Sequence, residues 1–170
     1  MIIDVDPEEE HHKLVYAKFG LAVYFSQIFE QGLVNLITLL DAANTQGITK
    51  DTFDELFSLH SKKTLGILIK KVKVHVKFSS ETTQALEVAL SKRNYLIHSY
   101  FYEQVPKFVT EEGRNTMLQE LEDIRLCLSE ADKRIDPATQ SLMKKLGFTE
   151  EMLKQAAIDI VGKDHADKII

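Results

Sequence analysis

The longest continuous feature of the sequence is an apolar pattern at helical spacing that runs from Pro7 to about Ala43. The stretch Asp6 to Glu9 is typical of a helix start, because Asp caps the end and acidic residues complement the helix dipole. One stripe of the pattern should face a core: Val15, Ala22, Phe25, Phe29, Leu36 and Leu40, widened by Leu14, Leu21 and Ile28. A helix that is apolar on so much of its surface must pack against other elements, so the sequence predicts a helical bundle.

Further helices are predicted where a capping residue precedes an apolar run. Thr49, Thr64 and Ser79 each open such a segment, and Thr110 opens a long one that reaches about Ile135. The helix after Ser79 is predicted to end at Pro106. Only residues 72–78 alternate like a strand, and with no second strand to pair with they indicate a frayed helix end or an extended link. The fold expected is an all-α, antiparallel bundle of about four to five core helices.

The C-terminal part repeats the start signal of the first helix. Asp136 and Pro137 predict a short helix that ends near Gly147, and Thr149 caps a last helix that reaches about Val161. We therefore expect residues 1–135 to form the bundle and residues 136–170 to form a C-terminal helical hairpin packed on the same domain.

Composition restricts the class of protein further. The chain has 170 residues, of which 44% are hydrophobic and 28% charged, as expected for one globular domain. A net charge of −5 argues against a general nucleic-acid coat protein. The single cysteine, Cys127, is expected to be a packing residue, and a cytoplasmic location is the simplest interpretation. No membrane segment is expected, and His11 and His12 are expected on a solvated face.

Residues 85–101 contain the feature that points to function. As one helix they form an apolar arc of Leu86, Leu90, Ile97 and Phe101, and Arg93 projects into that arc. Asn94 and His98 lie one turn apart along its edge. Either Arg93 packs its stem and extends its guanidinium to water, or it is paired or faces a cleft or a partner.

The order Arg93, Asn94 and His98 is an Arg-x4-His motif with Asn after the Arg, and Tyr100 extends it to Arg-x4-His-x-Tyr. In its helical setting the motif resembles the HEPN superfamily, small helical domains that include many metal-independent ribonucleases. The longer form is similar to HEPN toxins that are paired with nucleotidyltransferase antitoxins. The resemblance implies no metal and no cofactor, and it implies a homodimer with a composite site at its interface.

The motif suits RNA cleavage, in which the ribose supplies the nucleophile. His98 is the expected proton carrier, and Arg93 is expected to neutralise the charge that grows on the phosphate. Asn94 is expected to orient the phosphate or the imidazole, and Tyr100 to stack a base or donate a hydrogen bond. Arg93 and His98 lie roughly 140° apart around a helix and about 7.5 Å along it, so two copies across a two-fold axis would build one cleft.

Basic residues cluster around the motif. Residues 60–98 contain eight Lys or Arg against two acidic residues. Lys70, Lys71, Lys73 and Lys92 are the candidates for contacts with an RNA backbone. The alternative is a solvated lysine face.

Three functions agree with these features. The first is a metal-independent endoribonuclease of HEPN type. The second is a non-catalytic HEPN-like module that dimerises and binds a protein or nucleotide partner. The third makes the chain a toxin or phage-defence protein, with Tyr100 as the residue that an antitoxin modifies.

Overall fold

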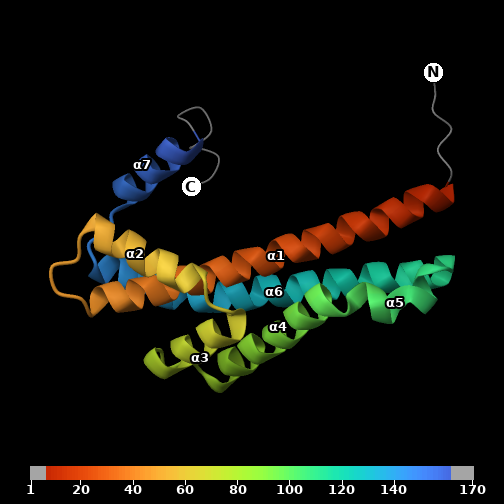
Figure 1. Cartoon of the computed structure of the whole chain (residues 1–170), viewed down its shortest axis with the longest axis horizontal. Coiled ribbons are helices and arrows are strands. Elements are labelled where there is room, and N and C mark those ends of the chain that lie inside the picture. The colour runs from red at the N-terminus through yellow and green to blue at the C-terminus, as the bar shows by residue number, and fades with distance from the viewer. Residues whose placement is uncertain (1–6, 162–170) are drawn as a thin grey trace.

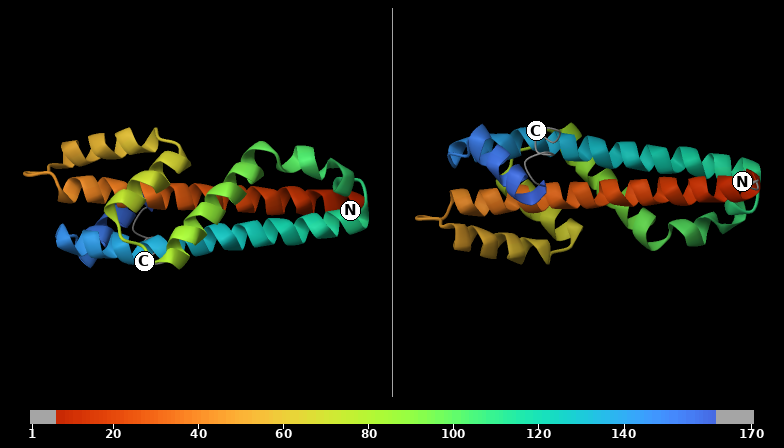
Figure 2. Two further views of the ribbon diagram at one scale, coloured as in Figure 1. Left: turned by 90° about the horizontal axis from the view of Figure 1, so that it is seen from below. Right: turned by 90° about the horizontal axis from the view of Figure 1, so that it is seen from above.

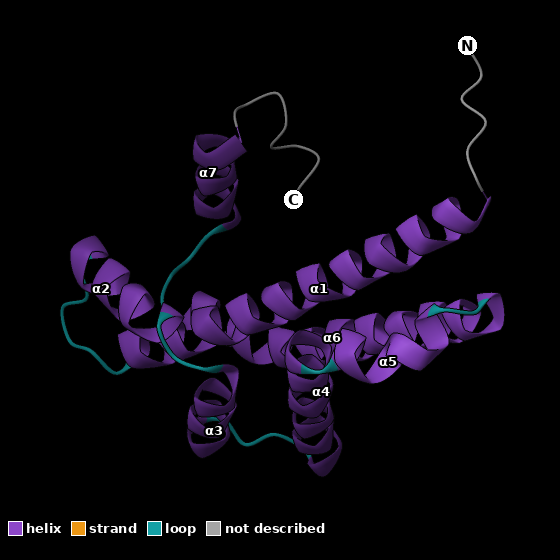
Figure 3. Ribbon diagram, turned by 45° about the vertical axis from the view of Figure 1, so that its right-hand side comes forward, coloured by secondary structure: helices purple, strands orange, loops and turns teal. Residues whose placement is uncertain are grey.

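The structure, a computed structural model, describes residues 7–161. Regular secondary structure in this range is entirely helical, which confirms the predicted all-α class (Figure 3). The seven helices are α1 (Pro7–Ala43), α2 (Lys50–Ser61), α3 (Leu65–His75), α4 (Ser80–His98), α5 (Tyr100–Phe108), α6 (Glu111–Lys145) and α7 (Glu150–Val161).

The two longest helices, α1 and α6, lie side by side, run in the same direction and form the spine of the molecule (Figure 1). Contacts of His11 with Arg114 and of Lys18 with Glu122 set this parallel register, which differs from the antiparallel arrangement predicted for the bundle. The α1 stripe is buried as predicted at Val15, Ala22, Phe29 and Leu36, but Leu14 and Leu21 are exposed, so the predicted widening is wrong there. The facing stripe of α6 is Met117, Leu121, Ile124, Leu128, Ala131 and Ile135. Although α1 and α6 are long, no described helix is apolar enough over sufficient length to cross a membrane.

The remaining helices are distributed unevenly around this spine. Seen from below, α4 crosses it obliquely, and α3 and α4 form a V beside it (Figure 2, left). α4 and α5 pack on α6, whereas α2 and α3 pack on the C-terminal half of α1. Seen from above, none of the helices α2 to α5 and α7 covers the N-terminal half of α1 or the part of α6 beside it (Figure 2, right). The motif therefore lies on the covered side of the spine.

The predicted helix starts are largely confirmed. The side chains of Thr49, Ser79 and Thr110 each accept a hydrogen bond from a backbone N–H of the first turn, whereas Thr64 precedes α3 without such a bond. The segment that alternates like a strand is the last turn of α3 followed by an extended residue, Val76. The expected cap Asp6 and the tail 163–170 lie outside the described residues.

The prediction of one helix from Ser79 to Pro106 is wrong. α4 ends at His98, and Ser99 has φ −130° and ψ −20°, outside helical geometry. The chain resumes as α5, which contains Pro106 instead of ending there. Tyr100, the first residue after the break, is buried in the core, and burial of this large ring favours the change of direction.

The prediction of a new helix at Asp136 is also wrong, because α6 continues through Pro137 to Lys145. Proline removes one backbone donor and usually breaks a helix. Here Pro137 is exposed, while Ala138 and Leu142 continue the apolar face that packs on the core. That packing stabilises the helix on both sides of the proline, and the end of α6 belongs to the spine instead of a separate hairpin.

Candidate active site

Arg93 lies on the buried face of α4, but the face differs from the predicted arc. The buried residues of α4 are Leu86, Ala89 and Leu96, whereas Ile97 is exposed. Arg93 falls between Ala89 and Leu96 on that face, with a side chain that is 22% exposed. The arginine therefore occupies a position where an apolar residue would be expected, and its partners decide its role.

The partners of Arg93 come from α1 and from its own neighbour. Nη2 donates to Oε2 of Glu30 on α1 at 3.2 Å, and Nη1 donates to Oδ1 of Asn94 at 3.3 Å. Nε is buried and has no hydrogen-bond partner among residues 7–161. Arg93 is therefore paired, as one of the two interpretations predicted, and its guanidinium does not simply extend to water. It still has donors without a partner in the described part of the chain.

His98 lies in a different environment, although it belongs to the same helix. It is the last residue of α4, it is exposed, and it makes no hydrogen bond or ion pair to the described part of the chain. The five residues that separate it from Arg93 correspond to about 140° and about 7.5 Å on one helix. Within one chain, the guanidinium and the imidazole therefore do not converge tightly on one atom.

Tyr100 is a core residue, so its predicted contact with RNA is wrong. The ring is 1% exposed, and the hydroxyl donates to the backbone carbonyl of Met117 on α6 at 3.2 Å. Burial, aided by the nearby Glu120, raises the pKa of Tyr100. The same burial removes the hydroxyl from the reach of a modifying enzyme in this conformation.

Exposed apolar residues lie immediately beyond His98. Tyr102 is 87% exposed, Val105 57% and Val109 68%, and they recur every three or four residues along α5 and its end. We call these three residues the α5 strip. Ile97 of α4 is also 40% exposed. Contiguous exposed apolar surface often marks an interaction site, which makes this strip a candidate for one.

The four lysines predicted to bind RNA have different environments. Lys71 Nζ lies 2.7 Å from Oδ2 of Asp41, which also accepts from buried His60, so Lys71 is already paired inside the fold. Its contact with RNA stays a prediction. Burial would raise the pKa of Asp41, but Lys71 and His60 together hold it below its ordinary value. Lys73 pairs with Glu87 of α4.

Lys70 and Lys92 complete the set. Lys70 is exposed and makes no ion pair within residues 7–161. Lys92 is half-buried and lies near Cys127. Burial of the Cys127 thiol raises its pKa, and the positive charge of Lys92 opposes that shift only in part. A thiol with a raised pKa is a poor nucleophile, in agreement with a packing role for Cys127.

The sequence did not reveal a second buried arginine at the far end of α5. Arg114 is 4% exposed and donates to the carbonyl of Phe108 at 3.0 Å. Its Nε lies 3.4 Å from His11 Nδ1, and its Nη1 lies 3.3 Å from His12 Nε2. The expectation of a solvated face for these histidines is therefore wrong, because both rings are used to hold α1 against α6.

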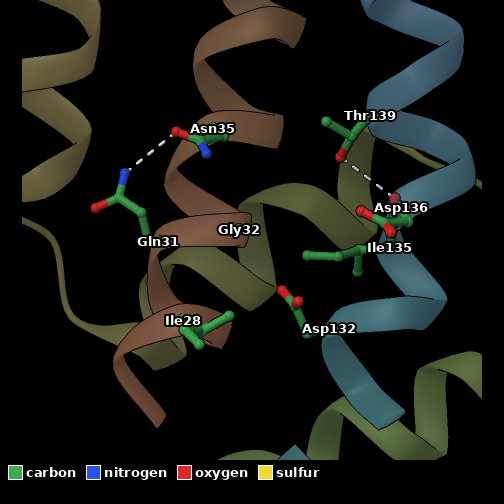
Figure 4. A pocket seen from close by; sticks show the side chains of 8 residues that line it. All are labelled: Ile28, Gln31, Gly32, Asn35, Asp132, Ile135, Asp136 and Thr139. Carbon is green, nitrogen blue, oxygen red and sulfur yellow. Dashed lines mark hydrogen bonds between the residues drawn. The ribbon is translucent and has the colours of Figure 1, made fainter. Parts of the chain in front are cut away.

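A polar pocket of about 300 Å³ lies between α1 and α6 (Figure 4). Asp132 and Asp136 of α6 line it opposite Gly32 and Asn35 of α1. A side chain at position 32 would collide with the Asp132 carboxylate. Burial, reinforced by the charge of Asp136, raises the pKa of Asp132 to about 6. Since Gly32 and Glu30 are two residues apart and point to opposite sides of α1, this pocket is separate from Arg93.

The fold and the site define an all-α bundle with an arginine–histidine pair, and the comparisons add no family to that description. No family model, no curated protein and no solved structure matches the chain. No group of three or more His, Cys, Asp or Glu within the described residues has the geometry to hold a metal ion.

Proposed function

We propose that this chain is a metal-independent endoribonuclease of HEPN type that works as a homodimer with a composite site. The observation that supports it best is the state of Arg93, a partly buried guanidinium with unused donors on the same helix as a free imidazole. Most buried side-chain donors have at least one hydrogen-bond partner, so the Nε of Arg93, unpaired within residues 7–161, is a donor that a ligand can use.

In the proposed reaction the ribose 2′-oxygen attacks the adjacent phosphorus, and the bond from phosphorus to the 5′-oxygen breaks. His98 takes the proton of the 2′-hydroxyl, and an imidazolium returns a proton to the departing 5′-oxygen. Arg93 binds the non-bridging oxygens as their negative charge grows, and Asn94 orients that guanidinium. The products are a 2′,3′-cyclic phosphate and a 5′-hydroxyl.

Dimerisation would bring together an arginine and a histidine that one chain does not place at the same phosphate. Because Arg93 and His98 diverge on one helix, a two-fold axis near the end of α4 is needed to bring two such pairs to one cleft. The α5 strip begins four residues after His98 and offers the apolar contact for that axis. Sedimentation at micromolar concentration is expected to give a dimer, and Val105→Asp a monomer.

The decisive experiment is cleavage of a generic RNA in the presence of EDTA. Wild-type protein should release 2′,3′-cyclic phosphate ends, and His98→Ala should reduce the rate by about 10²-fold or more. His75→Ala is the matched control, since His75 is also an exposed histidine at the end of a helix. Equal rates for wild type and His98→Ala would reject the proposed role.

The alternative function is a non-catalytic module that dimerises and binds a partner. It requires the α5 strip but not the chemistry of His98, so a stable dimer without ribonuclease activity would favour it. Growth inhibition on expression, relieved by changing Arg93 or His98, would instead favour a toxin or defence role.

A further inference from the structure

A groove of about 370 Å³ lies between α3 and α4, beside the proposed active site. Ile69 and Val74 of α3 and Leu90 of α4 give it apolar walls, and Lys70 and Lys73 stand along its α3 side. Glu87 of α4 completes the lining and pairs with Lys73. Apolar walls with a small number of charged groups are typical of a pocket for an amphipathic ligand.

Leu90, which lines the groove, shares one face of α4 with two residues of the proposed site. Leu90, Asn94 and His98 follow one another at four-residue spacing, so they lie on the same side of the helix. Leu90 and His98 are about 12 Å apart along the axis. That length corresponds to a few stacked nucleotides at about 3.4 Å each.

We infer that this groove binds one nucleotide of a single-stranded RNA, a few positions from the phosphate that is cleaved. The base lies against Leu90 and Ile69, and the ammonium groups of Lys70 and Lys73 hold the adjacent phosphate. Glu87 accepts a hydrogen bond from an amino group of the base. The inference rests on the proposed ribonuclease function, and it adds a binding subsite to it.

Charge supports a phosphate-bearing ligand over an uncharged one. Lys70 makes no ion pair within residues 7–161, so its charge is available to a ligand. Glu87, the partner of Lys73, has a side chain that is 60% exposed, and an exposed pair of this kind is easily rearranged. A phosphate can therefore recruit both lysines at little cost.

The test measures binding of a fluorescent 2′-O-methyl RNA hexamer, which lacks the nucleophile and reports binding without cleavage. Lys70→Glu should weaken binding at least tenfold and lower the salt dependence of the affinity. Lys133→Glu, an exposed lysine on α6, should change the affinity less than twofold.

A second pair of variants tests the apolar part without changing charge. Gly66 lines the groove, so Gly66→Leu should fill it and weaken hexamer binding at least fivefold. The control is Gly20→Leu, because Gly20 is a helical glycine with open space around it. Circular dichroism of both variants verifies that they fold.

The outcomes separate this inference from the proposed function. If Lys70→Glu and Gly66→Leu cleave RNA normally and bind the hexamer as the wild type does, the groove is not a nucleotide site. The proposed ribonuclease function then still stands. Groove-dependent hexamer binding without any cleavage supports the groove and overturns the ribonuclease. Displacement of the hexamer by an equal concentration of poly-glutamate would show that the groove binds an acidic protein segment. That result would overturn the inference that it binds a nucleotide.

Discussion

Arg93 and Arg114 both lie on apolar faces of this bundle, and they differ in how their donors are used. Arg114 is 4% exposed and is held by a backbone carbonyl and two histidines. Arg93 is 22% exposed, donates to Glu30 and Asn94, and keeps Nε without a partner. Burial of a charge is therefore not by itself a sign of function. The candidate for chemistry is Arg93, whose Nε has no partner among the described residues and which shares α4 with the exposed His98.

The largest effect is expected from removing the two guanidinium groups in turn. Arg114→Met should lower the free energy of unfolding by about 2–4 kcal/mol, because it leaves the carbonyl of Phe108 without its donor. Arg93→Met should cost no more than about 1 kcal/mol, since its ion pair is partly solvated. Urea denaturation measures both, and equal losses would remove the distinction between the two sites.

Added volume next to Arg114 should destabilise the protein about as much as removal of the Arg114 guanidinium. A Cβ at Gly113 would collide with the backbone carbonyl of Lys107, at the turn from α5 to α6. Gly113→Ala should therefore cost about 2–3 kcal/mol in thermal or urea unfolding. Gly20→Ala, in an open stretch of helix, should instead stabilise the protein by about 0.5–1 kcal/mol. A neutral Gly113→Ala would show that this end of the bundle is loosely packed.

The Asp132 pocket should give stability a pH dependence that neither arginine gives. The pKa of this carboxyl is about 6 in the folded protein against an ordinary 3.8, so between these values the folded state binds more protons than the unfolded one. The free energy of unfolding should therefore fall by about 1 kcal/mol as pH rises through that window, after allowance for solvent screening. Asp132→Asn should flatten the profile, whereas the exposed Asp123→Asn should not. A slope of opposite sign would contradict the burial of Asp132.

The smallest effect concerns the carboxylate that holds Arg93. Glu30 must give way when a phosphate binds the guanidinium, so Glu30→Gln should raise the affinity for the 2′-O-methyl hexamer about threefold to fivefold. Glu130→Gln is the control, because Glu130 pairs with Arg134 on the exposed side of α6. Weaker binding by Glu30→Gln would mean that Glu30 positions the arginine for RNA instead of competing with it.

The local signals in the sequence predicted most of the fold. Capping residues such as Thr49 and Thr110 and the apolar stripes of α1 and α6 act within a few residues, so they can be read without a structure. Pro106 and Pro137 gave the wrong helix boundaries because packing decided them. Tyr100 is buried just after the break at Ser99, and the apolar stripe of α6 continues past Pro137.

The candidate site could be predicted only in part. The spacing of Arg93 and His98 is visible in the sequence, and so is the position of Arg93 on a buried face. Its partner Glu30 is sixty-three residues away in the chain, and no local pattern indicates such a pair. The same is true of the contacts of Arg114 with His11 and His12, which join the N-terminal ends of α1 and α6.

The most direct test of the account is the rate of RNA cleavage by Arg93→Lys, measured in EDTA beside its free energy of unfolding. Lysine keeps the charge but loses the forked donors, so the rate should fall by about 10²-fold or more while stability changes by less than about 1 kcal/mol. A rate equal to that of the wild type, with the fold intact, would contradict the claim that the incompletely satisfied guanidinium performs the chemistry.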